Sequence, residues 1–425
     1  MNFLLRLGLA CLCVAAPAVV AAPIPVEVRE SAPGRFELWR EGAPYYVRGA
    51  GGSHRLDRLA AAGGNSVRTW GAEEAEKILD EAQRLGLTVC AGLWIEHENQ
   101  GFNYNDDAAV QAQIERHCRA VDRLKDHPAL LVWGVGNEAE MGASNPRLWE
   151  VIEAVAAYIQ RVDPHHPVMT VTAGVPPWAI RELMQRCPSV DLLGVNSYGP
   201  LTRVADDVRA VGWRGAYLVT EWGPDGTWEV EKTPWGAEIE ATSTATAVQR
   251  AYRYAAILGD RDRCVGSYAF LWGQKQEGTP TWFGLFTEAG GETESVEMLA
   301  ALWSRRDPSG LTPRIGSLRL NGAAALPGVR VASGARAAAT CPIIRGEQLR
   351  VTWELLRERM RKSEGGAFEP RPPTLPVRRA RESLEAGAAR LEFNAPSEPG
   401  AYRLFIYVQA PGGQVATANI PFRVE

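Results

Sequence analysis

The chain has 425 residues, of which 46% are hydrophobic and 23% are charged, and its formal net charge at pH 7 is −4. This is the composition of a globular protein with enough apolar residues for a large core and a second domain, and it excludes disordered and fibrous classes. The slight excess of acidic residues gives no reason to expect a nucleic-acid partner.

Residues 1–21 predict a secretion signal. Arg6 gives a positive start, Leu7–Ala16 form an apolar stretch, and the small residues of Val19–Ala21 fit a cleavage site. The alternative is a membrane anchor, but Pro17 interrupts a run that is short for a membrane span. We therefore expect a secreted or periplasmic protein that is not inserted in a membrane once the signal is removed.

The cysteines after residue 21 are few and widely spaced. They are Cys90, Cys118, Cys187, Cys264 and Cys341. An odd number without a C-x-x-C pair argues against a zinc site and against a dense disulfide framework. One or two disulfides remain possible at this stage.

Residues 22–44 predict a β-hairpin ahead of the main domain, because apolar residues near Phe36 and Leu38 lie between Gly34 and Gly42. We expect this hairpin to cover the bottom of the domain that follows.

Residues 45–309 alternate between apolar strands and amphipathic helical stretches, a pattern that predicts a (β/α)8 TIM barrel of the usual size, ~250 residues. The alternative is an open doubly wound sheet, but no G-x-G-x-x-G motif follows the first strand. The predicted strands are Tyr45–Gly49, Ser66–Trp70, Thr88–Ile95, Leu130–Gly136, Val168–Thr172, Leu192–Ser197, Ala216–Glu221 and Gly266–Trp272. Helical stretches between them include Ala72–Leu85, Ala108–Leu124, Pro146–Val162, Pro177–Arg186, Arg203–Val211 and Thr244–Leu258.

Residues 310–425 lose the helical period and predict a small immunoglobulin-like β-sandwich. Glu364–Arg379 is rich in proline, arginine and glycine, and we expect it to be a long surface loop. The sandwich could bind glycan or brace the barrel, and the lack of an exposed aromatic row favours bracing.

Polar and aromatic residues gather at the ends of the predicted barrel strands, where active sites of this fold lie. Asn137 and Glu138 follow the fourth strand, and Glu221 ends the seventh. The other strand-end candidates for substrate binding are Arg68, Trp70, Trp94, His97, Asn196, Tyr198, Trp222 and Trp272.

Two carboxyl groups facing each other suit cleavage of a glycosidic bond, which needs one protonated acid and one anion at ~5 to 5.5 Å in retaining enzymes. Repulsion would raise the pKa of the acid, while Arg68 would keep the other group charged. Asn137 could donate a hydrogen bond to the sugar 2-hydroxyl, and Tyr198 could orient the anion. The alternative is that Glu138 and Glu221 are structural carboxylates in salt bridges, with Arg68 as a structural ion pair.

Two long loops add candidates for an extended ligand. Trp228 lies in the segment 223–243, and Gln274 and Trp282 lie in the segment 273–291. Indole faces offer flat apolar area to pyranose rings, although packing in the core is an equal alternative for Trp94, Trp228 and Trp282.

The motifs Gly-Asn137-Glu138 and Thr-Glu221-Trp-Gly resemble the acid/base and nucleophile signatures of clan A, the 4/7 superfamily of retaining glycoside hydrolases. The barrel is most similar to that of glycoside hydrolase family 2, and fungal β-1,3-glucanosyltransferases look like more distant relatives. The resemblance covers about Tyr45–Asp307. It implies double displacement, with Glu221 as the nucleophile and Glu138 as the acid/base.

We expect neither a metal nor a cofactor. The cluster Glu96, His97 and Glu98 could suggest a metal site, but a hydrogen bond from His97 to substrate or packing of its loop explains it better. A metal-dependent barrel hydrolase would need a His-x-His at the first strand, and residues 45–54 have none.

The sequence thus predicts an enzyme, a retaining β-glycoside hydrolase or transglycosylase that acts on a β-glucan-like polysaccharide or oligosaccharide. The alternative is a non-catalytic carbohydrate-binding protein on the same scaffold. No protein partner can be inferred from the sequence.

Overall fold

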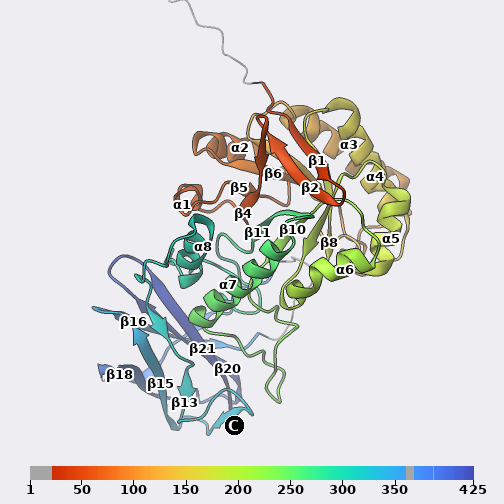
Figure 1. Cartoon of the computed structure of the whole chain (residues 1–425). Helices are drawn as coiled ribbons and strands as arrows, with labels where there is room; N and C mark the ends of the chain where they lie inside the picture. The colour runs from red at the N-terminus through yellow and green to blue at the C-terminus, as the bar shows by residue number, and fades with distance from the viewer. Residues whose placement is uncertain (1–21, 360–367, 386) are drawn as a thin grey trace, which may run out of the picture.

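The computed structural model describes residues 22–359, 368–385 and 387–425, so the predicted secretion signal at 1–21 lies outside the described residues. They form a closed barrel surrounded by helices, a small sheet before it and two sheets after it (Figure 1). No helix in the described ranges is long and apolar enough to cross a membrane. The five cysteines after residue 21 are all free, so none of the possible disulfides forms.

The barrel has eight parallel strands in sequence order, and β11 closes it by pairing with β4, where Gly266 lies opposite Val47. The strands are β4 (Val47–Gly51), β5 (Ser66–Arg68), β6 (Thr88–Leu93), β7 (Leu130–Val135), β8 (Val168–Ala173), β9 (Leu192–Asn196), β10 (Tyr217–Trp222) and β11 (Cys264–Ala269). Every residue of β7 is buried, because helices cover the outside and side chains fill the inside.

Helices connect the strands and form the outer ring of the barrel (Figure 1). They are α1 (Leu56–Ala61), α2 (Ala75–Arg84), α3 (Asp107–Leu124), α4 (Arg147–Val162), α5 (Pro177–Arg186), α6 (Val204–Ala210), α7 (Ser243–Gly259) and α8 (Glu294–Ser304), with short 3-10 turns η1 (Glu98–Gln100) and η2 (Gly199–Arg203). In α4, Leu148, Ile152, Val155 and Ile159 recur at helical spacing and are buried. The predicted TIM barrel is therefore confirmed.

A three-stranded antiparallel sheet precedes the barrel, made of β1 (Val26–Ala32), β2 (Arg35–Arg40) and β3 (Ala43–Tyr45). The predicted hairpin thus gains a third strand. Val26 and Leu38 pack in one cluster with residues of the barrel strands, such as Leu131 and Leu218. The sheet closes the end of the barrel opposite the C-terminal sheets, as expected (Figure 1).

The residues after the barrel form a β-sandwich, whose two sheets share one apolar core that includes Leu391 and Phe393 from one sheet and Leu404 and Phe422 from the other. The first sheet contains β12 (Arg314–Ile315), β13 (Arg319–Leu320), β15 (Arg336–Arg345), β18 (Arg378–Glu385) and β19 (Ala388–Asn394). The second contains β14 (Val329–Val331), β16 (Arg350–Arg357), β17 (Thr374–Leu375), β20 (Gly400–Gln409) and β21 (Val415–Val424). The predicted sandwich is confirmed.

Four strands of the sandwich were not predicted, namely the two-residue strands β12 and β17 and the longer strands β15 and β18. In β15 the inward positions are Ala337, Ala339 and Cys341, whose small side chains give a weak alternating signal. The edge strand β18 is charged and mostly exposed, and it begins inside the stretch 364–379 that we expected to be a loop. That expectation holds for residues 368–373 and 376–377. It was wrong for 374–375 and 378–379, where pairing with β16 and β19 compensates for low strand propensity.

Hydrogen bonds attach the sandwich to the barrel near the start of α7. The backbone N–H of Ile315 donates to Thr244 Oγ1 at 3.1 Å, and that of Thr417 donates to Ser243 Oγ at 2.8 Å. Arg403 donates from Nη2 to the carbonyl oxygen of Glu238 at 2.8 Å. The sandwich is thereby fixed on the segment that links β10 to α7.

We predict that Leu38→Ala destabilises the protein by about 2–5 kcal/mol, because Leu38 is fully buried and truncation leaves a cavity at the bottom of the barrel. Urea denaturation measures the difference. Val248→Ala is the control, since Val248 is 51% exposed on α7 and its truncation should change stability by about 0.5 kcal/mol at most. Equal stability of the two variants would contradict a role for the sheet as the cover of the barrel.

Candidate active site

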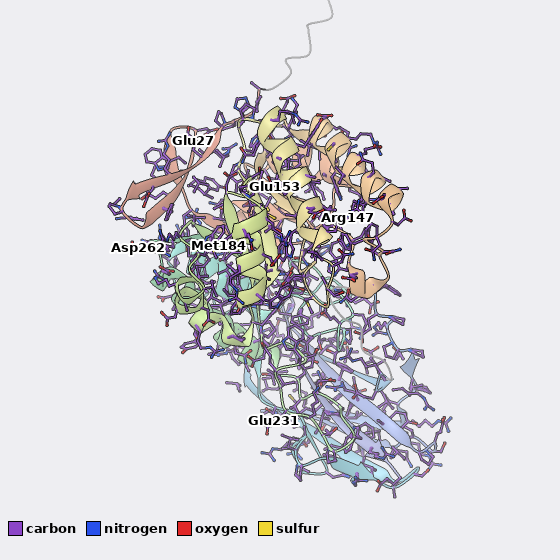
Figure 2. All side chains as sticks on the ribbon, turned by 90° about the vertical axis from the view of Figure 1, so that its right-hand side faces the viewer. Glu27, Arg147, Glu153, Met184, Glu231 and Asp262 are labelled. Carbon is purple, nitrogen blue, oxygen red and sulfur yellow. The ribbon has the colours of Figure 1, made fainter. Side chains whose placement is uncertain are left out.

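A cavity of about 1050 Å³ opens at the carboxyl ends of the barrel strands. Its walls include Trp70 after β5, Asn137 and Glu138 after β7, and Tyr198 and Glu221 from the ends of β9 and β10. Both predicted carboxylates thus lie in one cavity, as expected for residues at strand ends of a TIM barrel. The segment after β10 also reaches the sandwich, and Figure 2 shows Glu231 of this segment at the level of the sandwich sheets.

Glu221 is buried and accepts three hydrogen bonds from side chains. Its Oε1 accepts from Arg68 Nη1 at 2.9 Å and from Trp70 Nε1 at 2.7 Å. Its Oε2 accepts from the hydroxyl of Tyr198 at 2.9 Å. Because the guanidinium of Arg68 is also buried, it supplies the countercharge that a buried carboxylate needs.

Glu138 has a different environment. It has a positive φ of 51° and follows Gly136 at φ 80°, so the chain turns sharply where β7 ends. Its carboxylate accepts a hydrogen bond from Asn196 Nδ2 at 2.9 Å. Burial and the nearby charge of Glu221 raise the pKa of Glu138 to about 8, although the bond from Asn196 acts in the opposite direction. Both effects favour the protonated form of Glu138.

Two amides link the environments of the two carboxylates. Asn137 Oδ1 accepts from Arg68 Nη2 at 2.6 Å and from Asn196 Nδ2 at 3.1 Å. A continuous hydrogen-bonded path thus runs from Glu221 through Arg68, Asn137 and Asn196 to Glu138. The predicted ion pair of Arg68 is present, and it belongs to this network.

Four of the predicted aromatic residues line the cavity, namely Trp70, Trp94, Tyr198 and Trp228. Trp228 is 59% exposed, and its ring meets that of Tyr198 edge to face at 5.6 Å. An exposed indole in a cavity wall offers a flat apolar surface to a ligand.

His97 does not line the cavity, contrary to its prediction as a substrate-binding residue. It is buried, stacks on Trp94 at 4.8 Å, and places Nε2 2.9 Å from the carbonyl oxygen of Asn137. Its role in the structure is to support these two residues. Glu96 pairs with Arg116 at 2.9 Å, and within the described ranges no three His, Cys, Asp or Glu side chains are arranged to hold a metal ion.

Trp222 and Trp272 also face away from the cavity, contrary to prediction. Successive side chains of a strand point to opposite faces, so Trp222 points outward while Glu221 points inward, and it stacks on Tyr254 of α7 at 5.7 Å. Trp272 is fully buried against Phe286 at 5.3 Å.

Gln274 and Trp282 do not line the cavity, because Gln274 bonds within its own loop and Trp282 joins that loop to the loop after β10. Gln274 Nε2 donates to the carbonyl oxygen of Pro280 at 3.3 Å, and Trp282 Nε1 donates to that of Asp225 at 2.9 Å. Polar atoms of long loops need partners of this kind when the loop folds back on the barrel. Both were predicted to contact substrate, and the structure instead places them in contacts that hold the loops.

Several cavity residues were not predicted. Phe270 and Leu271 take the place expected for Trp272, and Glu277 lines the cavity, paired at 2.8 Å with Lys275, a residue of the loop that we expected at the mouth. Arg359 also lines it, although it belongs to the sandwich. No pattern in the sequence could have shown this position, because it depends on how the two domains pack.

Glu140 is a third buried carboxyl group, two residues after Glu138. It accepts a hydrogen bond from the backbone N–H of Ala173 at 2.6 Å, and burial raises the pKa of Glu140 to about 7. In the sequence, only its position in Asn-Glu-Ala-Glu, two residues after Glu138, could have indicated that Glu140 lies near the site. Its charge, when present, acts on Glu138 in the same direction as that of Glu221.

Comparisons with known proteins agree with this geometry. Residues 54–211 match the family model for glycosyl hydrolases family 2, TIM barrel domain. A protein of Aspergillus terreus (strain NIH 2624 / FGSC A1156) named probable mannan endo-1,4-β-mannosidase C is 26% identical over 155 residues, which are 30% of this chain and 38% of that protein. A β-glucuronidase of Chlorocebus aethiops is 26% identical over 194 residues, which are 41% of this chain and 28% of that protein.

Among solved structures, the crystal structure of an FMN-binding β-glucuronidase from Facaelibacterium prausnitzii L2-6 has a TM-score of 0.51 at 16% identity, over 94% of this chain and 59% of that one. This likeness shows the fold. The chain spans 28% to 38% of the length of the two relatives named above. Its barrel is similar to the TIM-barrel domain of glycoside hydrolase family 2, which confirms the resemblance predicted from the motifs at Glu138 and Glu221.

Proposed function

We propose that the protein is a retaining β-glycosidase or transglycosylase, with Glu221 as the nucleophile and Glu138 as the acid/base. The observation that carries this proposal is that two glutamates line one cavity in different environments. Glu221 is paired with Arg68, whereas Glu138 has a pKa raised to about 8. Cleavage of a glycosidic bond by double displacement needs one anion and one proton donor.

In the first step, a Glu221 oxygen forms a bond to the anomeric carbon while the bond from that carbon to the leaving oxygen breaks. The electron pair goes to the leaving oxygen, which takes the proton of Glu138. Arg68, Trp70 and Tyr198 hold Glu221 through three hydrogen bonds, so little reorganisation is needed when it attacks. The products are a leaving alcohol and a glycosyl ester of Glu221.

In the second step, the Glu138 carboxylate takes a proton from water or from a sugar hydroxyl, whose oxygen attacks the anomeric carbon. The ester bond to Glu221 breaks, and both residues return to their starting states with retention of configuration. Asn137 Oδ1 is occupied by Arg68 and Asn196, which leaves its N–H donors for the sugar 2-hydroxyl. Such a bond strengthens in the oxocarbenium-like transition state.

The proposed substrate is a β-glucan-like polysaccharide or oligosaccharide, met outside the cytoplasm if residues 1–21 act as a secretion signal. The cavity of about 1050 Å³ has room for more than one sugar ring, because sites for small molecules are usually about 300–1,000 Å³. A product profile on β-1,3-, β-1,4- and β-1,6-linked glucans would identify the linkage. Products longer than the substrate would identify transglycosylation.

We predict that Glu138→Ala lowers kcat on β-glycosides with poor leaving groups by about 10²–10⁴-fold, since the proton donor is lost. Dinitrophenyl glycosides should keep a fast first step, because their leaving group needs no proton. Glu221→Ala should lose turnover on both kinds of substrate. Steady-state and burst kinetics on a panel of aryl β-glycosides measure these effects.

Glu96→Gln is the matched control, because Glu96 also follows a barrel strand but pairs with Arg116 on the surface. It should leave turnover unchanged. Unchanged turnover in both Glu138→Ala and Glu221→Ala would end the proposal. Binding of glucan without any product over long incubation would favour the alternative, a non-catalytic carbohydrate-binding protein.

We predict that kcat/KM falls as the pH rises above about 8. Burial and the charge of Glu221 raise the pKa of Glu138 to about 8, so the group keeps its proton up to that pH and loses it above. An unperturbed glutamic acid, with a pKa of ~4.3, would be deprotonated above pH 5. A pH series on a substrate with a poor leaving group tests this, and loss of activity already at pH 5 would contradict it.

A further inference from the structure

The sandwich contributes Arg359 to the wall of the cavity. This residue follows β16 by two positions, and its side chain is only 8% exposed. The hydrogen bonds between the sandwich and α7 brace the barrel, as expected from the sequence. Bracing does not require an arginine in the cavity, so Arg359 calls for a second explanation.

The charge of Arg359 is already compensated. Its Nη1 donates to both carboxylate oxygens of Glu369 at 2.9 Å, and its Nη2 lies 3.6 Å from a carboxylate oxygen of Glu238. Both carboxylates are buried. A ligand would therefore gain little from carrying a negative charge, because two anions surround the guanidinium.

Hydrogen-bond donors of Arg359 nevertheless remain. The contact of Nη2 with Glu238 at 3.6 Å is too long for a hydrogen bond, so the N–H groups of Nη2 remain available. A ligand oxygen in the cavity can accept from them. A neutral acceptor such as a sugar hydroxyl fits this requirement.

The neighbouring wall has the other features of a sugar site. Trp228 presents an exposed indole, and Lys275 and Glu277 form a pair with both donors and acceptors. Trp228 touches Tyr198, whose hydroxyl donates to Glu221. This part of the cavity therefore adjoins Glu221, the residue that would hold the glycone sugar.

We propose that Arg359, Trp228, Lys275 and Glu277 form a subsite for a second, uncharged sugar unit of the glycone, so that the sandwich takes part in substrate selection. The inference rests on the proposed function. The substrate would have at least two sugars on the glycone side. The two glutamates could then act on an internal glycosidic bond.

The first test compares aryl β-glycosides that carry one sugar with those that carry two or three of the same sugar. Arg359→Lys keeps the charge between Glu238 and Glu369 but removes the planar donor fork. Trp228→Ala removes the exposed indole. Each variant should lose about 3- to 10-fold more in kcat/KM on the longer glycosides than on the one-sugar glycoside, mainly through KM.

Two matched controls separate these effects from folding. Arg371→Lys changes another arginine that joins the sandwich to the barrel, through Glu354 at 2.5 Å and Glu288 at 3.0 Å, but does not line the cavity. Trp178→Ala removes another exposed indole, at 44% exposure, outside the cavity. Both controls should behave as the unmodified protein on every chain length.

A second test measures binding without turnover. In full-length protein with Glu221→Gln, calorimetry with neutral gluco-oligosaccharides of one to four units should show tighter binding of two units than of one. Adding Arg359→Lys or Trp228→Ala should remove most of that difference. Binding can be measured even if the unmodified protein cleaves no glycoside. Lack of activity would therefore end the proposed function, whereas the calorimetry would still test the subsite.

Losses that are equal for one-sugar and longer ligands would overturn the subsite. The same holds if neither variant differs from its control, or if no neutral oligosaccharide binds. A loss confined to the longer ligands, with thermal unfolding unchanged, supports it.

Discussion

The site depends on the buried ion pair between Arg68 and Glu221. Removing two charges from water is costly, and their attraction compensates only if the remaining polar atoms also find partners. Here Trp70 and Tyr198 satisfy the carboxylate, and Asn137 accepts from the second guanidinium nitrogen. Because these residues come from different strands, closure of the barrel is the condition for satisfying the pair.

The same pair makes two chemically identical residues different. Glu221 has a cation in contact, whereas the Glu138 side chain accepts a hydrogen bond from the amide of Asn196. The negative charge of Glu221 then favours the protonated form of Glu138, as its raised pKa indicates. A half-buried neutral acid in a strained backbone conformation at φ 51° does not itself stabilise the fold. Such local costs are typical of functional sites.

The sequence predicted those parts of the structure that follow from local patterns. Apolar strands alternating with amphipathic helices indicated the barrel. Because strand ends meet at one face of this fold, the sequence also predicted that Arg68, Asn137, Glu138 and Glu221 lie close together. The errors have physical causes. Trp222 is one residue beyond Glu221, and strand alternation turns it outward.

Other features could not be predicted, because they depend on packing between distant segments. His97 ends under Asn137, outside the cavity, since a buried ring needs a partner for its nitrogen. The strand β15 relies on small residues whose signal is weak. Arg359 reaches the cavity only because the sandwich docks on α7 and the segment before it.

The family match covers residues 54–211, which contain Arg68, Asn137, Glu138 and Asn196 but neither Glu221 nor the loops after β10 and β11. Glu221 is therefore placed in the proposed active site by its hydrogen bonds to residues within the family match, above all to Arg68. The rest of the chain also supplies Trp228, Lys275 and the docked sandwich to the cavity. Within one cavity, the proposed proton donor thus lies in the part that is similar to family 2. The residues proposed to select the sugar chain lie outside that part. The substrates of similar proteins are for this reason weak evidence for the substrate of this protein. The contacts around Arg359 in its own cavity are stronger evidence.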